Sequence, residues 1–298
     1  MGGVMTNFKS QVSEIKSQCG LFVGLVTLDL IYLAECTPGV NQKVVASEYT
    51  VAAGGPATNA AVAFSYLGDR ATVMGIVGQA EMAQLIRDDL TSCGVQIADL
   101  QPTTTQSPPI SSIIVTQATG ERAVVSINAV KSQVNSDVPE DILADVEIVL
   151  IDGHQMAVGK TIAILAKVKK IPVVIDGGSW KPGMSQLLPE VDYAICSANF
   201  YPPGCHTSAE VMAYLQGLGI PHIAITHGEK PIEYYWRGES GFLDVPIIQA
   251  VDTLGAGDVF HGAFCHYILR ASFPDALAAA AQIAAKSCQF FGTRRWRV

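Results

Sequence analysis

Two carboxylates in the C-terminal part of the chain frame a segment that could transfer a phosphoryl group. Asp252 and Asp258 stand six residues apart, and a Gly-Ala-Gly turn at 255–257 lies between them. Apolar residues follow at helical spacing from Val259, so the small residues are expected to begin a helix. The first turn of a helix leaves backbone N–H groups open, and the helix dipole favours an anion there. A carboxylate among those donors could take a proton from a hydroxyl group.

A second motif, Gly-Gly-Pro-Ala-Thr-Asn at 54–59, runs into an alanine-rich segment. The paired glycines would let a ligand approach the backbone closely, and Pro56 suits the first position of a helix. Asn59 could then offer both a donor and an acceptor to a polyol. Taken alone, the motif fits an ordinary turn before a helix equally well.

A third candidate is Asp29, which follows the apolar run at 21–28. We interpret this run as a strand that ends at the acid. In open α/β sheets, ligands bind beyond the carboxyl ends of the strands, so an acid there could grip sugar hydroxyls. An aspartate in such a position is otherwise a turn or capping residue.

Together these three motifs resemble the ribokinase/PfkB carbohydrate kinase family, and the resemblance extends from about residue 21 to 292. The segments 25–33 and 251–258 are similar to ketohexokinase-like members, whereas Gly-Gly-Pro-Ala and Asp-Val-Phe-His-Gly-Ala are similar to sulfofructose-kinase-like members. The resemblance implies an ATP-dependent sugar kinase that transfers the γ-phosphate of Mg-ATP to a primary hydroxyl.

The resemblance also implies a role for each matching residue. Asp258 would be the general base, Gly255, Ala256 and Gly257 the anion hole, and Asp252 a neighbour of a monovalent cation such as K⁺. The implied sugar-binding residues are Asp29, Gly55, Asn59, Asp152 and His154, with Asn41 from the lid segment. The implied nucleotide-binding residues are Thr226, Gly228 and Asn199, with the helix expected over 275–291.

Two of the three stretches that depart from the family pattern concern the nucleotide and its metal; the third is the family's Gly-Asp-Asp-x-x-Gly region, which reads Gly-Gln-Ala-Glu-Met-Ala at 78–83. The family's Asn-x-x-Glu motif, tied to magnesium and phosphate, reads Asn-Phe-Tyr-Pro at 199–202 and therefore lacks the acid. The nucleotide turn at 226–231 ends in Pro231 where the family has glycine. Both departures concern the nucleotide and its metal and leave the catalytic segment intact.

The expected elements alternate between strands and helices. Apolar runs at 21–28, 71–77, 147–151, 172–175, 193–196 and 222–226 are typical of buried strands, and helical patterns cover 58–67, 81–93, 155–169, 208–217 and two segments after 256. This alternation predicts a mostly parallel sheet with helices on both faces. The resemblance makes it a ribokinase-like three-layer α/β/α sandwich.

Two extended segments, at about 31–53 and 110–128, interrupt this alternation. We expect them to form a small separate β-sheet that acts as a lid over the site. The domain organisation predicted is a loose N-terminal extension over 1–20 and one kinase domain over 21–298. A homodimer through the lid is the expected assembly.

The composition limits the other classes of function. Hydrophobic residues make up 49% and charged residues 15%, and the net charge of −8 argues against nucleic acid or an anionic membrane as partner. The seven cysteines show no CxxC pair, which favours reduced thiols and a cytoplasmic protein over a disulfide framework or a zinc site. The longest apolar run, 21–34, is too short and too polar to span a membrane.

Three alternatives stay open. A nucleoside kinase of the same fold has the same catalytic motif, and a non-catalytic sugar- or nucleotide-binding member would explain the two departures. A P-loop is mimicked by Gly153 and Gly159-Lys160-Thr161, but five residues separate the glycines where a P-loop has four. His261 is expected to be an ordinary packed histidine, and Arg294, Arg295 and Arg297 a solvated terminus.

Overall fold

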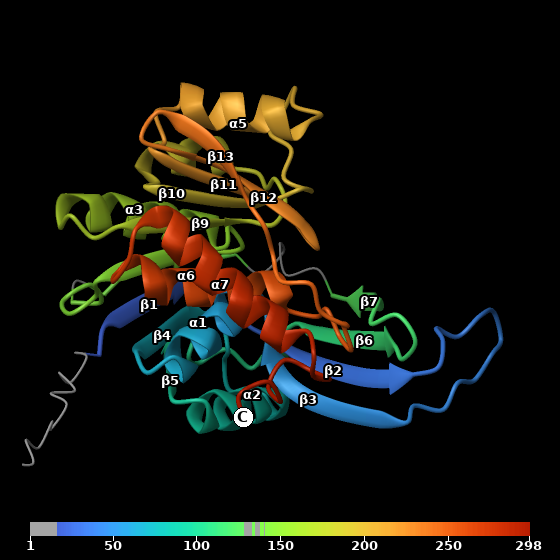
Figure 1. The fold of residues 1–298 in the computed structure, drawn as a ribbon. Helices are drawn as coiled ribbons and strands as arrows, with labels where there is room; N and C mark the ends of the chain where they lie inside the picture. The colour runs from blue at the N-terminus through green and yellow to red at the C-terminus, as the bar shows by residue number, and fades with distance from the viewer. Residues whose placement is uncertain (1–16, 128–132, 135–137, 140) are drawn as a thin grey trace, which may run out of the picture.

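The computed structural model describes residues 17–127, 133–134, 138–139 and 141–298, and within these ranges the chain forms two sheets (Figure 1). The large sheet has nine strands in the described ranges: β1 (Cys19–Val23), β4 (Arg70–Gly75), β5 (Val95–Asp99), β8 (Ile148–Ile151), β9 (Val173–Gly177), β10 (Tyr193–Ser197), β11 (His222–His227), β12 (Lys230–Trp236) and β13 (Glu239–Leu243). Their spatial order is β13-β12-β11-β10-β9-β8-β1-β4-β5. The strands from β11 to β5 in this order are parallel, and β12 and β13 form an antiparallel edge.

The helices cover both faces of the large sheet. They are α1 (Pro56–Tyr66), α2 (Glu81–Ser92), α3 (Met156–Val168), α4 (Met184–Leu187) with a 3₁₀ turn at Leu188–Glu190, α5 (Ser208–Gly217), α6 (Ala256–Ile268) and α7 (Phe273–Ser287). Alternate strand residues explain the two layers: Phe22 and Leu150 pack toward α1, α2, α6 and α7, whereas Val23 and Ile151 pack toward α3, α4 and α5. The expected three-layer α/β/α sandwich is confirmed. In the described ranges, no helix has the length and apolar character needed to cross a membrane.

The small sheet lies beside the body and has the order β3-β2-β6-β7 (Figure 1). It contains β2 (Thr27–Ala34), β3 (Glu48–Gly54), β6 (Ile110–Thr116) and β7 (Arg122–Ser126). Its inner face is apolar because Ile31, Leu33, Ile113 and Val115 are buried there against Phe291. The two segments predicted to be extended therefore supply strands that pair with one another, but residues 35–47 between β2 and β3 form a loop. Residue 128 lies outside the described ranges.

The strand predicted over 21–28 is wrong in one respect that matters for the site. β1 ends at Val23, the chain turns over residues 24–26, and β2 begins the small sheet at Thr27. Asp29 therefore lies within the first strand of the small sheet and does not end a strand of the large one. Most of the expected N-terminal extension, residues 1–16, lies outside the described ranges, and Cys19 and Gly20 already belong to β1.

The topology changes direction at β1, and this change defines one end of the site. From β1 the chain continues to β4 on one side, whereas β8 lies on the other side. Ligands in open parallel sheets bind beyond the carboxyl ends at such a point. Asp152, directly after β8, accepts a hydrogen bond from the Leu25 N–H just after β1, at 2.9 Å. The two strand ends are therefore joined by this carboxylate.

Candidate active site

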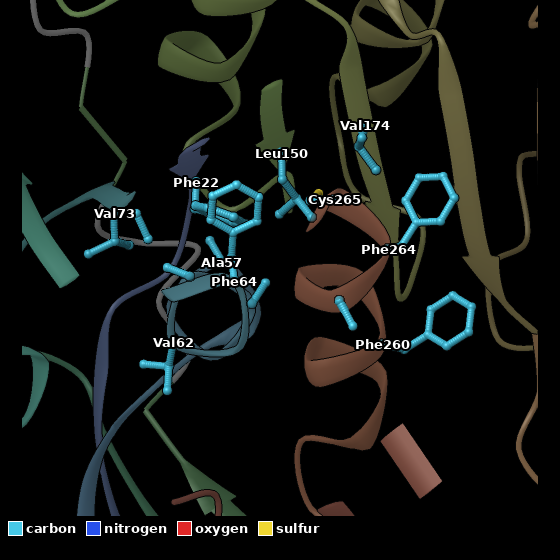
Figure 2. Packing of buried hydrophobic residues seen from close by; sticks show 14 of the residues in the cluster. Phe22, Ala57, Val62, Phe64, Val73, Leu150, Val174, Phe260, Phe264 and Cys265 are labelled. Carbon is cyan, nitrogen blue, oxygen red and sulfur yellow. The ribbon is translucent and has the colours of Figure 1, made fainter. Parts of the chain in front are cut away.

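The helices α1 and α6 lie side by side on one face of the large sheet, as Figure 2 shows from their buried side chains. Gly262 allows this close approach, since a Cβ atom there would lie only 2.1 Å from the Ala60 carbonyl oxygen. The packing brings the first turns of both helices together. Asn59 Nδ2, from α1, donates a hydrogen bond of 2.8 Å to Asp258 Oδ2 of α6.

The Asp258 carboxyl is held in a buried and negatively charged environment. Burial and, to a smaller extent, the nearby Asp176 carboxylate at the end of β9 raise its pKa, which lies at about 7. The Asn59 hydrogen bond and His261 act in the opposite direction. A carboxyl whose pKa lies close to neutral pH is matched to accept a proton and release it again.

His261 fixes the start of α6 against the sheet. Its Nδ1 lies 2.7 Å from the Gly257 carbonyl oxygen, and its Nε2 lies 3.2 Å from the Ile195 carbonyl oxygen of β10. Asp176 Oδ2 is 3.6 Å from the same Nδ1. The histidine is buried and no group of three or more His, Cys, Asp or Glu residues that could hold a metal ion exists in the described ranges. His261 therefore packs between α6 and β10 and holds the first turn of α6 in place.

The first turn of α6 is open. Gly255 precedes the helix in the left-handed conformation, with φ 73°. In the described part of the chain, the backbone N–H groups of Gly257 and Asp258 meet no hydrogen-bond acceptor. Donors of this kind, held in place by the helix, can stabilise an anion with little rearrangement.

A cavity of about 800 Å³ begins at this turn and extends between β11, β12 and α7. Ala256 and Gly257 line one end, and Thr226 and Gly228 line the strand side. The remaining walls are largely apolar, formed by Ile232, Val245, Pro246, Ile247, Ile248, Phe260, Ala281, Ala284, Ala285 and Cys288. An apolar slot next to open N–H donors is suited to a flat ring carrying an anionic tail.

Two cationic side chains line the same cavity. Lys230 lies at the start of β12, and Arg122 lies on β7 of the small sheet. Arg122 Nη1 donates to Thr253 Oγ1 at 3.3 Å, and Thr253 Oγ1 in turn donates to the Gly120 carbonyl oxygen at 3.1 Å. The small sheet therefore touches the segment that leads into α6, and it brings a cation there. The sequence analysis missed Arg122, because no spacing links residue 122 to the motif at 252–258.

Comparison with known proteins agrees with this geometry. The model of the pfkB family carbohydrate kinases matches residues 21–296. The chain belongs to this family. It is therefore a phosphotransferase of the carbohydrate kinase class.

Individual relatives are similar at low identity over most of their length. The ribokinase of Bacillus subtilis (strain 168) is 23% identical over 81% of this chain and 83% of its own, and the deoxyribokinase of Salmonella typhi is 24% identical over 83% and 85%. The structure of Arabidopsis thaliana ribokinase complexed with ribose and ATP superposes with a TM-score of 0.77, at 22% identity over 93% of this chain and 94% of that one.

This pfkB kinase also brings a second acid, Asp29, close to the start of α1. Asp29 is buried and accepts a hydrogen bond of 2.8 Å from Thr27 Oγ1. Burial raises its pKa, and this is opposed by hydrogen bonds from Thr27 and Ser111 and by the Arg294 charge. Gly54 must be glycine, because a Cβ atom there would overlap the Asp29 carboxylate. Asp29, Gly55 and Asn59 are thus brought to one region.

Asp152 and His154 follow β8, where the sequence placed them, but the kinase uses the Asp152 carboxylate internally. It accepts hydrogen bonds from the N–H groups of Leu25, Ala57 and His154 at 2.9, 3.1 and 2.8 Å. Burial alone would raise its pKa, but the His154 ring and the N–H groups of Leu25 and His154 outweigh burial and lower it to about 2. A direct contact of Asp152 with substrate stays a prediction.

The structure does not bring Asn41 or Asn199 into this group. Asn41 is exposed in the long loop between β2 and β3, which projects away from the body of the kinase (Figure 1). Asn199 is exposed beyond β10 and does not line the cavity. Asp252 is buried, and its two oxygens accept the N–H groups of Leu254 and Gly292, each at 2.8 Å. It joins the C-terminal segment to the turn before α6.

The expected solvated basic terminus is wrong for Arg294. Its side chain is only 12% exposed and forms an ion pair with Asp89 of α2 at 2.9 Å. It also donates to Asn59 Oδ1 at 3.0 Å and to the Ala53 carbonyl oxygen at the end of β3. Arg295, in contrast, is exposed and pairs with Glu48. Local sequence gives no sign of this difference, because it depends on which side of the C-terminal turn faces α1.

Proposed function

We propose that the protein transfers the γ-phosphoryl group of Mg-ATP to a primary hydroxyl of a sugar, with Asp258 as the general base. The observation that carries this proposal is the position of a carboxyl with a pKa of about 7 at an open helix N-terminus beside the cavity. Its support is chemical: phosphoryl transfer depends on in-line positioning and charge stabilisation, and a base near neutral pKa adds roughly 10²–10⁴-fold.

In the proposed reaction, Asp258 accepts the hydroxyl proton and the sugar oxygen attacks the γ-phosphorus. The bond from that phosphorus to the bridging oxygen of ADP breaks, and ADP leaves with the electron pair. The open backbone N–H groups of Gly257 and Asp258 would face the charge that develops on the phosphoryl oxygens, whereas the Ala256 N–H already donates to the Thr253 carbonyl oxygen. Asp29, Gly55 and Asn59 would bind the sugar hydroxyls, and the small sheet would close over them to exclude water.

The nucleotide is expected to occupy the 800 Å³ cavity, with its base between the apolar walls and its phosphates toward α6. Arg122 and Lys230 supply charges that suit a polyanion. Mg²⁺ would enter with ATP as part of the substrate, since the described residues offer no protein cage for it and Mg²⁺ is commonly held by substrate phosphates. A monovalent cation such as K⁺ beside Asp252 stays a prediction; its test is activity in K⁺ against tetramethylammonium salts.

The direct test is Asp258→Asn, which keeps the shape of the side chain and removes its basicity. We expect turnover, measured as ADP release with a sugar acceptor, to fall by at least about 10²-fold while the circular dichroism spectrum is unchanged. Turnover near that of the wild type would overturn the assignment of the base.

The acceptor is tested with a panel of ketoses, aldoses and nucleosides under the same conditions. Ribokinase and deoxyribokinase are among the relatives, so ribose and deoxyribose belong in the panel. Turnover with nucleosides alone would favour the nucleoside kinase. A thermal shift with ATP but no ADP release with any acceptor would favour a non-catalytic binding protein.

We further propose a homodimer through the outer face of the small sheet. Strand alternation and register pair Tyr32 with Tyr49 on this face, and Val125 lies there as well. Tyr49 and Val125 are 71% and 77% exposed, which leaves an apolar face without cover. Tyr49→Asp with Val125→Lys should convert a dimer to a monomer in light scattering. A wild-type monomer at micromolar concentration would refute this assembly.

The proposed place of the reaction is the cytoplasm. All seven cysteines are free thiols, and Cys36 is exposed. Free thiols are typical of reducing compartments.

A further inference from the structure

The Arg294 side chain connects four segments of the chain around Asn59. Its Nε and Nη2 donate to Asp89 Oδ2 at 3.1 and 2.9 Å, and Nη2 also donates to the Ala53 carbonyl oxygen at 2.6 Å. Its Nη1 donates to Asn59 Oδ1 at 3.0 Å, and to the Thr293 carbonyl oxygen and hydroxyl. The guanidinium is therefore held in one orientation by α2, β3 and the C-terminal turn, and it presents one donor to α1.

This contact determines which way the Asn59 amide points. A guanidinium has donors only, so the amide atom that faces it must be the oxygen. The NH₂ group must then face the opposite direction, and there it donates to Asp258 Oδ2 at 2.8 Å. The order Asp89, Arg294, Asn59, Asp258 thus alternates acceptor and donor without conflict. With nothing to hold the oxygen, the amide could present either end to Asp258.

We propose that Arg294 is a positioning residue for catalysis, which holds the Asn59 amide with its Nδ2 toward Asp258 so that this carboxylate is supported as a base. The proposal rests on the proposed role of Asp258. Arg294 touches neither the Asp258 carboxylate nor the cavity, and it acts through Asn59.

The charges around Asp258 explain why one donor matters. Asp176 from β9 and Asp152 from the β8 end both disfavour its ionised form, whereas His261 of α6 and Asn59 of α1 favour it. If the amide turned its oxygen toward Asp258, the Nδ2 donor would be replaced by an oxygen with a partial negative charge, in addition to the two carboxylates. The carboxyl would then keep its proton to higher pH.

The test is the pH dependence of kcat/KM, because its acid limb reports the base of the free enzyme. We expect Arg294→Met to move the acid limb up by about 1 pH unit, since a hydrogen bond to a charged group is worth about that much. At a pH well above the limb, most of the kcat should return. Arg295→Met is the matched control, because this neighbouring arginine is exposed and pairs with Glu48; its acid limb should not move.

A double-mutant cycle separates hydrogen-bond orientation from simple loss of charge. Asn59→Leu should shift the acid limb in the same direction, and Arg294→Met combined with Asn59→Leu should add no further shift, because both changes remove one interaction. An unshifted limb in folded Arg294→Met would overturn the proposal. Shifts that add in the double variant would also overturn it, since Arg294 would then act as an independent charge.

A milder variant keeps the proposal testable if Arg294→Met does not fold. Asp89→Asn leaves the arginine in place but weakens its two contacts through Nε and Nη2, so a smaller shift in the same direction is expected. Failure of the proposed function itself is recognised separately: Asp258→Asn would retain turnover. If Asp258→Asn is inactive and the limb of folded Asp89→Asn is unmoved, only the role of Arg294 fails.

Discussion

The first turns of α1 and α6 both begin after a glycine, but their backbone N–H groups differ in whether the protein supplies an acceptor. Each follows a glycine with positive φ, at 102° for Gly55 and 73° for Gly255. At α1, the Asp152 carboxylate of the protein accepts the Ala57 N–H. At α6, the N–H groups of Gly257 and Asp258 find no acceptor in the described ranges. The same local chemistry therefore makes a structural joint at α1 and leaves open N–H donors at α6.

The acids at these two helices, Asp152 and Asp258, have pKa values that are shifted in opposite directions. Asp152 is surrounded by donors, which lower its pKa to about 2, whereas burial and the Asp176 charge raise that of Asp258 to about 7. Asp152 is expected to be ionised at every working pH, and Asp258 to exchange protons near neutrality. Asp152 is therefore suited to stabilise the fold, and Asp258 has the raised pKa that its proposed role as a base requires.

The largest expected effects are a loss of activity in Asp258→Asn and a loss of stability in Asp152→Asn. At pH 8, Asp258→Asn should lose at least about 10²-fold in turnover and melt at a higher temperature, because it no longer buries a charge. Asp152→Asn should retain most turnover below its melting point but lose about 2 kcal/mol or more, since backbone N–H groups become unsatisfied. Calorimetry and ADP release measure both. Loss of activity without loss of stability in Asp152→Asn would assign it to the substrate instead.

The pH dependence of stability should have opposite sign for the two variants. The folded-state pKa of Asp258 is raised above its ordinary value of 3.8, so the wild type loses stability as the pH rises from about 4 through 7. The advantage of Asp258→Asn should grow over that range. The folded-state pKa of Asp152 is lowered, so its contribution is present above about 4 and is lost as the pH falls toward 2. The defect of Asp152→Asn should therefore shrink toward pH 2.

A smaller contrast is expected between the two capping glycines. In Gly55→Ala, the new Cβ would lie 2.3 Å from the Leu25 carbonyl oxygen, so we expect on the order of 3 kcal/mol of destabilisation. In Gly255→Ala, the nearest atom to the Cβ would be Thr293 Cγ2 at 3.1 Å, with Asn59 and Asp258 at ordinary contact distances, and the left-handed backbone costs about 1–2 kcal/mol. Melting temperatures and turnover distinguish them: equal destabilisation would show that the two turns are equally rigid.

Arg122→Met tests whether the phosphates of ATP bind next to the open first turn of α6. Because Arg122 lines the cavity beside the α6 turn, we expect the KM for ATP to rise about tenfold and the KM for the sugar to change little. The effect should weaken at high salt, as screening reduces the contribution of an exposed charge. An unchanged KM for ATP would place the phosphates elsewhere.

The smallest effect is expected at Lys160. This residue lies within α3 and its Nζ donates to Gln186 Oε1 at 3.0 Å, so the segment that mimics a P-loop is helical and offers no loop to cradle phosphate. Lys160→Ala should leave turnover within about twofold of the wild type. A large loss of activity would revive the P-loop interpretation.

The sequence by itself determined the fold class, and it indicated the segment that we propose to be catalytic. Strand and helix periodicity are local properties, and the residues of the motif at 252–258 are neighbours along the chain. The tertiary structure decided the rest, because it depends on contacts across the chain. It put Asp29 in the small sheet, used the Asp152 carboxylate as an internal acceptor, and left Asn41 exposed on a loop.

Arg294 illustrates the physical reason best. It lies 235 residues from Asn59, and its neighbour Arg295 has the same chemistry but faces solvent. Nothing local distinguishes the two arginines. Only the packing of the C-terminal turn against α1, α2 and β3 decides which guanidinium loses its water and must find fixed acceptors.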